Sequence, residues 1–281
     1  MNTFKLCAFA DEADSRLDGQ IEALRGNGID YLEIRGVDGK NISGLTEAEA
    51  KAVKAKLDAA GLAVWSIGSP TGKIDIKKPF GKHLDEFCHM LELAHVLGAT
   101  HYRLFSFYGT GGSASCEDTV LERLNQFVDK AKGSGVTLCH ENEKDIYGDV
   151  AERCLAIHQK IPEIKAIFDP ANYIQCKVDV PAAWELLKDY VEYLHVKDAK
   201  ANGAVVPAGH GIGGLPGIIR DFGARGGGTL SLEPHLHVFK GFGRLEALVT
   251  GRGKQFAYKS QREAFDAAAA ALRVILDGIE G

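Results

Sequence analysis

The chain has 281 residues, of which 45% are hydrophobic and 25% are charged, and its formal net charge is -5 at pH 7. This balance excludes a disordered chain, and it argues against nucleic acid or an anionic membrane as the main partner, because those partners select clustered Lys and Arg. The length fits one domain over residues 1–281, and no apolar run approaches the length of a membrane span.

The six cysteines show no CxxC spacing, and several fall inside apolar segments, so we expect them to be reduced core residues. Near the amino terminus, Lys5 and then Asp11, Glu12 and Asp14 interrupt any apolar run of the kind found in signal peptides. We therefore expect a soluble protein in the cytoplasm. The oligomeric state stays open, and a homo-oligomer is compatible with the sequence.

Eight short apolar segments rich in β-branched residues predict β-strands. The first is FKLCAFA at residues 4–10, and the others are residues 29–35, 62–68, 99–105, 136–141, 164–169, 191–198 and 228–233. Apolar residues at helical spacing, such as Leu84, Phe87 and Leu91, predict amphipathic helices between the strands. Helix starts are predicted where Thr46 precedes Glu49 and Ser260 precedes Glu263 at capping-box spacing.

A glycine ends each of four helix-like stretches just before a strand-like one, and the intervals of 33, 37 and 37 residues match a βα repeat (Gly28, Gly61, Gly98 and Gly135). Eight such alternations are expected to close as a single (β/α)8 barrel of the α/β class, with all strand carboxyl ends on one face. The alternative is an open doubly wound sheet. The first strand lacks the GxGxxG turn typical of many such folds.

Four polar residues stand at the ends of the last four predicted strands: Glu141, Asp169, His195 and Glu233. Taken singly, each is compatible with capping the helix that follows. In a barrel, however, their strand ends surround one half of the mouth, so the four side chains can converge. Three carboxylates and one imidazole suit one divalent ion such as Mn, Mg, Co or Zn.

Strand alternation supports this convergence, because it places Cys139 on the same face as Glu141, and Ile167, Tyr193 and Ser231 on the faces of the other three. These residues are expected to fill the barrel interior. His140 has the opposite parity, and we interpret it as a structural histidine facing the helices, with a ligand role as the alternative.

These residues carry a resemblance to the xylose isomerase-like barrel superfamily of sugar and sugar-phosphate isomerases and epimerases, which includes the family-2 apurinic endonucleases. It spans nearly the whole chain and rests on the motifs GVTLCHEN, FDPAN, HVKD and LSLEPH, supported by YLEIRGVDGKN and YRLFSFY. The resemblance implies that Glu141, Asp169, His195 and Glu233 bind one divalent cation. It also implies that Glu141 and Glu233 act as acid and base on opposite faces of the substrate.

The chemistry gives an independent reason for such a site. Isomerising or epimerising a ketose removes a proton from the carbon next to a carbonyl, and the resulting enediolate carries negative charge. A cation bound to adjacent sugar oxygens lowers that cost. Two bases on opposite faces predict epimerisation, whereas a single base that moves a proton between neighbouring carbons predicts aldose–ketose interconversion.

Further residues are candidates for contact with a small sugar or sugar-phosphate substrate: Glu33, Arg35, Arg103, Glu143, Asn172, Lys197, His210 and His235. Each has a structural alternative, such as pairing of Arg103 with Glu33, or a solvated loop position for Glu143. Asn172 stands where many relatives have a histidine. The glycine-rich segment 208–217 is a candidate phosphate loop or simply a turn.

The leading hypothesis is a metal-dependent isomerase or epimerase of a small sugar, keto-polyol or sugar phosphate. A dehydratase of the inosose or dehydroshikimate type is the alternative, because the same base can lead to loss of a β-hydroxyl. An apurinic endonuclease is disfavoured by the acidic balance and by the lack of histidines near the ends of the first three strands. A non-catalytic sugar-binding barrel is disfavoured by the complete acid set.

Overall fold

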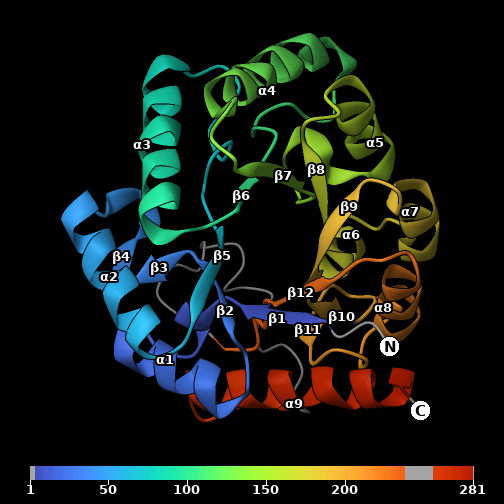
Figure 1. Cartoon of the computed structure of the whole chain (residues 1–281). Helices are drawn as coiled ribbons and strands as arrows, with labels where there is room; N and C mark the ends of the chain where they lie inside the picture. The colour runs from blue at the N-terminus through green and yellow to red at the C-terminus, as the bar shows by residue number, and fades with distance from the viewer. Residues whose placement is uncertain (1–3, 238–255, 281) are drawn as a thin grey trace.

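The protein, as described by a computed structural model over residues 4–237 and 256–280, is built around a closed barrel of eight parallel strands (Figure 1). Each strand lies inside one of the eight predicted segments, so the predicted (β/α)8 barrel is confirmed. The strands are β1 (Lys5–Ala8), β2 (Tyr31–Ile34), β5 (Ala63–Ile67), β6 (His101–Leu104), β7 (Thr137–Glu141), β8 (Lys165–Phe168), β9 (Val191–Val196) and β12 (Thr229–Leu232). They follow chain order around the barrel, and β1 pairs with β12 to close it.

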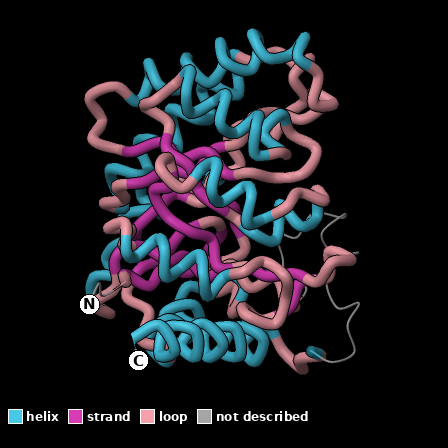
Figure 2. The backbone as a smooth tube through the Cα atoms, turned by 90° about the vertical axis from the view of Figure 1, so that its right-hand side faces the viewer, coloured by secondary structure: helices cyan, strands magenta, loops and turns pink. Residues whose placement is uncertain are grey.

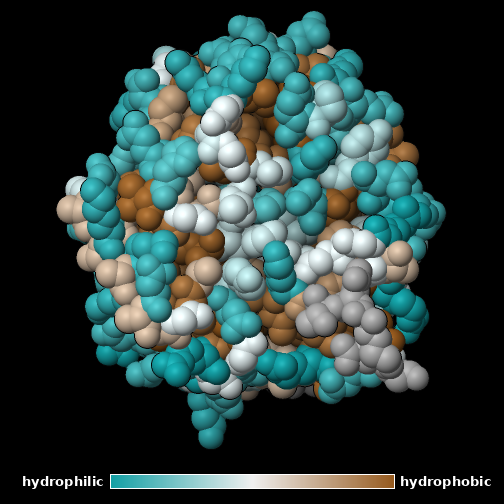
Figure 3. Space-filling view, in the orientation of Figure 1, coloured by the Kyte–Doolittle hydropathy of each residue, from teal (hydrophilic) through white to brown (hydrophobic). Residues whose placement is uncertain are grey.

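Helices surround the strands, as Figure 2 shows from the side. They are α1 (Leu17–Gly26), α2 (Glu47–Ala59), α3 (Gly81–Leu97), α4 (Glu117–Ala131), α5 (Ala151–Lys160), α6 (Pro170–Gln175), α7 (Val180–Leu187), α8 (Leu215–Ala224) and α9 (Gln261–Glu280). In α3 the predicted apolar positions Phe87 and Leu91 are buried, and Leu84 is partly buried against the same core. The outer surface in Figure 3 is largely hydrophilic, with hydrophobic residues showing in the gaps between hydrophilic ones.

Short hairpins and 3-10 turns lie in the loops of the described part of the chain. The hairpins pair β3 (Gly36–Val37) with β4 (Lys40–Asn41), and β10 (Asp198–Ala199) with β11 (Val205–Val206). The turns are η1 (Ala10–Glu12), η2 (Ile42–Gly44), η3 (Ala114–Cys116) and η4 (Tyr147–Asp149). The turn η1 follows the first barrel strand directly, so its acidic residues lie at the carboxyl end of the barrel.

Most of the predicted helix caps and helix-ending glycines are present in the structure. Thr46 and Glu49 form a complete capping box at the start of α2. At α9, the Ser260 hydroxyl accepts the N–H of Glu263 at 3.1 Å, but the Glu263 carboxylate accepts the N–H of Lys259 at 2.6 Å, one residue before the position a capping box requires. All four repeat glycines have positive φ, and Gly98 ends α3 in the left-handed conformation.

Strand alternation correctly predicts which side chains face the barrel interior and which face the helices. Cys139, Ile167 and Tyr193 form their own buried cluster, apart from the larger core of the molecule. His140 occupies the opposite side of β7, where its Nε2 lies 2.9 Å from Ser106 Oγ and its ring lies 5.9 Å from that of His158. Burial lowers the pKa of His140 to about 3, so the ring is neutral at pH 7.

The six cysteines are free thiols, as expected, but the expected core position holds only for Cys7, Cys139 and Cys154; the other three are partly exposed (Cys88, Cys116 and Cys176). Within residues 4–237 and 256–280, none of the helices combines the length and apolar character needed to cross a membrane.

Candidate metal centre

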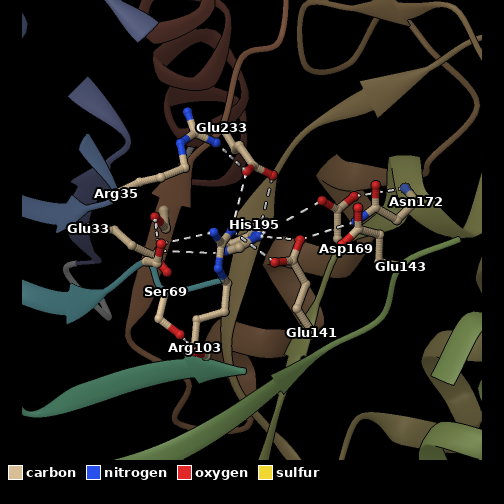
Figure 4. Close-up of polar contacts among 12 residues, drawn as sticks. Glu33, Arg35, Ser69, Arg103, Glu141, Glu143, Asp169, Asn172, His195 and Glu233 are labelled. Carbon is tan, nitrogen blue, oxygen red and sulfur yellow. Dashed lines mark hydrogen bonds and ion pairs between the residues drawn. The ribbon is translucent and has the colours of Figure 1, made fainter. Parts of the chain in front are cut away.

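The four strand-end residues singled out in the sequence lie together at the carboxyl end of the barrel (Figure 4). Glu141 is the last residue of β7, Asp169 follows β8, His195 lies near the end of β9 and Glu233 follows β12. Each offers one ligand atom within 4.8 Å of the others, and all four residues are buried. The barrel topology therefore brings together side chains that are up to 92 residues apart in the sequence.

His195 is at the centre of this group. Its Nδ1 lies 3.1 Å from Glu141 Oε1, 3.6 Å from Glu233 Oε2 and 3.9 Å from Asp169 Oδ2. Its Nε2 lies 3.3 Å from a carboxylate oxygen of Glu33 on the other side of the ring. This orientation suits Nδ1 as the ligand atom, with Nε2–H donating to Glu33.

The two carboxylate oxygens of Asp169 have different partners. They correspond to the two roles considered from the sequence, capping of a helix and binding of an ion. Oδ1 accepts the N–H of Asn172 at 2.9 Å and caps the start of α6. Oδ2 faces the cluster, lies 2.7 Å from Lys197 Nζ and accepts no hydrogen bond of good geometry. The capping role and a role in the cluster are thus compatible in one residue.

The buried charges shift several pKa values. Burial alone would lower the pKa of His195, but the carboxylates of Glu141 and Glu33 outweigh it and raise the pKa to about 10. Burial acts to raise the pKa of Glu141, but His195 and Arg103 hold it at about 2. For Asp169, burial prevails over the attraction of Lys197 and raises the pKa to about 7. The pKa of Glu233 is held well below its usual range, against burial, by Lys197, His235 and His195.

The donor set fits a divalent cation. Three carboxylates and one imidazole converge without a thiol, and the buried Oδ2 of Asp169 is available as an acceptor. Besides its contact with Asp169, the Lys197 ammonium lies 2.8 Å from Glu233 Oε2, so a bound ion would share two carboxylates with it.

Arg103 joins the two glutamates. Its Nη1 lies 3.0 Å from Glu141 Oε2 and 3.5 Å from Glu233 Oε1, while Nη2 donates to the carbonyl of Gly68 at 3.2 Å. This buried arginine therefore pairs with carboxylates, as expected, but they belong to Glu141 and Glu233 and not to Glu33. The guanidinium also lies over the ring of Phe9, with its carbon 4.8 Å from the ring centre.

Glu33 is completely buried behind His195. Its carboxylate accepts hydrogen bonds from Tyr193 Oη at 2.9 Å and from Ser231 Oγ at 2.6 Å, in addition to its contact with His195. These three contacts place Glu33 directly behind the His195 ring. The sequence analysis selected Glu33 as a candidate substrate contact, and that assignment stays a prediction.

Arg35, directly after β2, reaches the cluster and is held by two acids that the sequence analysis did not select. Asp11 binds its Nε and Nη2 at 2.9 Å each, Glu12 lies 3.1 Å from Nη2, and Arg35 Nη1 lies 3.2 Å from Glu233 Oε1. Burial raises the pKa of Glu12 to about 8. The position of this acid pair directly after the first strand was the signal available in the sequence.

Other predicted contact residues lie around the same site. Asn172 Nδ2 donates to Glu141 Oε1 at 3.1 Å. Glu143 lies 2.7 Å from Lys73, in an ion pair at the loop. The His235 backbone N–H donates to Glu12 Oε2 at 2.6 Å, and its Nε2 lies 3.6 Å from Glu233 Oε1.

His210 is the predicted residue that the fold does not bring to this cluster. It is exposed, its ring lies 5.3 Å from that of Phe256, and it lines a cavity of about 390 Å³ between α8 and α9. The residue was selected from its glycine-rich context, and that context serves a different contact described below.

Solved structures with the same fold cover nearly the whole chain. A xylose isomerase-like TIM barrel protein from Mycobacterium smegmatis in complex with magnesium is 17% identical, with a TM-score of 0.71 over 99% of this chain and 98% of that one. The IOLI protein with a bound zinc atom is 14% identical, with a TM-score of 0.73 over 98% and 99% of the two chains. D-psicose 3-epimerase with D-tagatose, from Clostridium cellulolyticum H10, is 15% identical, with a TM-score of 0.72 over 98% and 99%.

No curated protein sequence matches the chain. A family model described as the xylose isomerase-like TIM barrel matches residues 21–273, which is most of its length. With the closed barrel and the similar solved structures, this match shows that the chain belongs to the xylose isomerase-like TIM barrel family.

Proposed function

We propose that the protein is a divalent-metal-dependent isomerase or epimerase that acts on a small ketose or keto-polyol by moving a proton next to the carbonyl. The observation that carries this proposal is the convergence of Glu141, Asp169, His195 and Glu233 within 4.8 Å at the barrel mouth. Sugar epimerases among the proteins of similar fold support it.

The four residues would have two kinds of role. Asp169 and His195 would hold the ion, while Glu141 and Glu233 would bind it and also exchange protons with the substrate. When bound, a divalent cation would polarise the carbonyl and offset the negative charge of the enediolate. In Figure 4 the two glutamate carboxylates approach the His195–Asp169 line from opposite sides. That placement suits removal of a proton on one face of a substrate and its return on the other.

Arg103 would keep both glutamates in their ionised form, because one of its nitrogens contacts a carboxylate oxygen of each. An ionised carboxylate is the form that accepts a proton. The same guanidinium would fix the separation of the two side chains, so it is a positioning residue in this proposal.

The test is solvent deuterium exchange by the purified, metal-loaded protein across a panel of ketoses and inososes. We expect incorporation at the carbon next to the carbonyl, and an inverted product at that carbon would identify an epimerase. An enone product would instead favour the dehydratase alternative. Absence of exchange with every compound would contradict the proposal.

The ligand assignment has its own readout. We expect Glu233→Gln to lower the bound metal measured after dialysis, whereas Glu192→Gln, at the other end of the barrel beside His101, should keep the wild-type amount. Unchanged metal content in Glu233→Gln would overturn the assignment.

A further inference from the structure

The loop between β11 and α8 is folded around one buried carboxylate. Asp198, at 1% exposure, accepts the N–H groups of Ala199 and Gly213 on Oδ1 at 2.9 Å each. Its Oδ2 accepts the N–H groups of Gly209 and Gly211 at 3.0 Å each. With two hydrogen bonds on each oxygen, the carboxylate has its full set of donors.

The glycines of this loop are required by the close approach of that carboxylate. A Cβ atom at Gly211 would lie 2.2 Å from Asp198 Oδ1, and one at Gly213 would lie 2.8 Å from it. Backbone N–H groups that point at one place form an anion-binding concavity. In barrels, loops after the seventh and eighth strands and the start of a following helix often bind phosphate, and this loop has that position. Here the chain's own carboxylate fills the concavity.

The cationic side chains of the candidate centre are also paired with carboxylates. Arg35, Arg103 and Lys197 each lie within 3.5 Å of at least two carboxylates. The buried carboxyl groups around them number six: Asp11, Glu12, Glu33, Glu141, Asp169 and Glu233. Among the residues that the structure describes, these three cations are thus each paired with carboxylates of the centre, and none of the three is left for an anionic substrate group.

We propose that Asp198 takes the place that a substrate phosphate has in other barrels, and that the substrate is an uncharged polyhydroxy ketone, neither phosphorylated nor carboxylated. This inference rests on the proposed function and narrows it. Burial of a phosphate or carboxylate without a partner is unfavourable. This cost would favour a ketose or inosose over a sugar phosphate or dehydroshikimate. We expect a difference of roughly tenfold or more in kcat/KM, which corresponds to about 1.4 kcal/mol.

The first test compares matched pairs in the deuterium-exchange experiment with metal-loaded wild type. The pairs are D-fructose with its 1- and 6-phosphates, and an inosose with 3-dehydroshikimate. We expect each uncharged compound to exchange faster than its charged counterpart. Preference for a charged member would overturn this inference and leave the proposed function standing, whereas no exchange in any compound would count against the proposed function.

The second test addresses the loop without any substrate. Inorganic phosphate at millimolar concentration is expected to leave the melting temperature of the wild type unchanged, because Asp198 already occupies the N–H groups. Asp198→Ala should melt at a lower temperature, and added formate should restore part of the loss. Stabilisation of the wild type by phosphate with no response of Asp198→Ala to formate would contradict the inference. The wild-type measurement decides alone if the variant does not fold.

Discussion

The carboxylate of Glu33 lies 3.3 Å from Nε2 of His195, on the side of the imidazole ring opposite the candidate metal ligands. Tyr193 and Ser231 also donate to this carboxylate, so its position is fixed from three directions. A carboxylate behind a metal-binding histidine selects the tautomer and increases the basicity of the ligand nitrogen. Glu33 would therefore act on a bound ion through His195.

Replacing Glu33 by Gln should weaken metal binding by roughly 10- to 100-fold, the range typical of loss of such a partner. The change keeps the shape of the side chain and removes its charge. Nδ1 of His195 then becomes less basic and donates its electron pair to the ion more weakly. Titration calorimetry with Zn²⁺ measures the effect. The matched control is Glu192→Gln, which removes the carboxylate 3.2 Å from His101 at the other end of the barrel. Equal affinities in the two variants would show that Glu33 does not support the site.

The sequence predicted the fold and the members of the cluster because both depend on short-range patterns. The two-residue period of β7 was enough to place Cys139 and Glu141 inside and His140 outside. Parallel strands then put all strand ends at one mouth, so four separate residues became neighbours without knowledge of any loop.

The contacts that the sequence did not predict depend on loops and on pairs far apart in the chain. The hydrogen bond between His235 and Glu12 joins residues 223 positions apart, and its geometry depends on a left-handed backbone at His235. The glycines near His210 indicated a loop with exposed N–H groups, but only the three-dimensional path shows that Asp198 fills it. No local pattern specifies which anion such a loop encloses.

Lys197→Met is expected to have opposite effects on the metal-free and metal-bound protein. Without metal, the variant leaves Asp169 and Glu233 without their ammonium partner, which should lower the free energy of unfolding by about 3 kcal/mol. With metal, the ion no longer competes with Lys197, so the rise in melting temperature on adding Mn²⁺ should exceed that of the wild type.

Calorimetric melting with EDTA and with Mn²⁺ checks both effects. Lys51→Met is the control, because its ion pair with Glu47 is exposed and is weakened by solvent. A smaller metal response in Lys197→Met than in the wild type would refute competition between the lysine and the ion.

His158 should make the stability of the metal-free protein fall in mildly acidic solution. Burial lowers the pKa of His158 to about 4 from its ordinary value of 6.5. Between those values the unfolded chain binds the proton and the folded protein does not, so the stability is complete above pH 6.5 and decreases as the pH falls towards 4. The decrease attributable to this residue is up to about 3 kcal/mol.

Urea unfolding at pH 7 and pH 4.5 in EDTA measures this dependence. His158→Gln should lose less stability than the wild type over that interval. Its stability at pH 7 should be lower, because it loses the contact between Nδ1 and the Ile164 carbonyl at 3.0 Å. His95→Gln, on the exposed side of α3, should follow the wild type. Identical pH slopes for His158→Gln and wild type would exclude His158 as the cause.

Two glycines close in sequence should respond in opposite directions to alanine. At Gly211 the new Cβ would lie 2.2 Å from Asp198 Oδ1 and 2.4 Å from the Ala199 carbonyl, so the loop must shift and weaken its hydrogen bonds to Asp198. We expect a loss of about 1–3 kcal/mol, as for an overpacked core. At Gly217, inside α8, no described atom outside its neighbours and its own helix backbone lies within 4 Å of the Cβ position, so alanine should stabilise the helix by up to about 1 kcal/mol. Urea unfolding of both variants checks the contrast, and a Gly211→Ala protein as stable as Gly217→Ala would show that the carboxylate does not hold this loop closed.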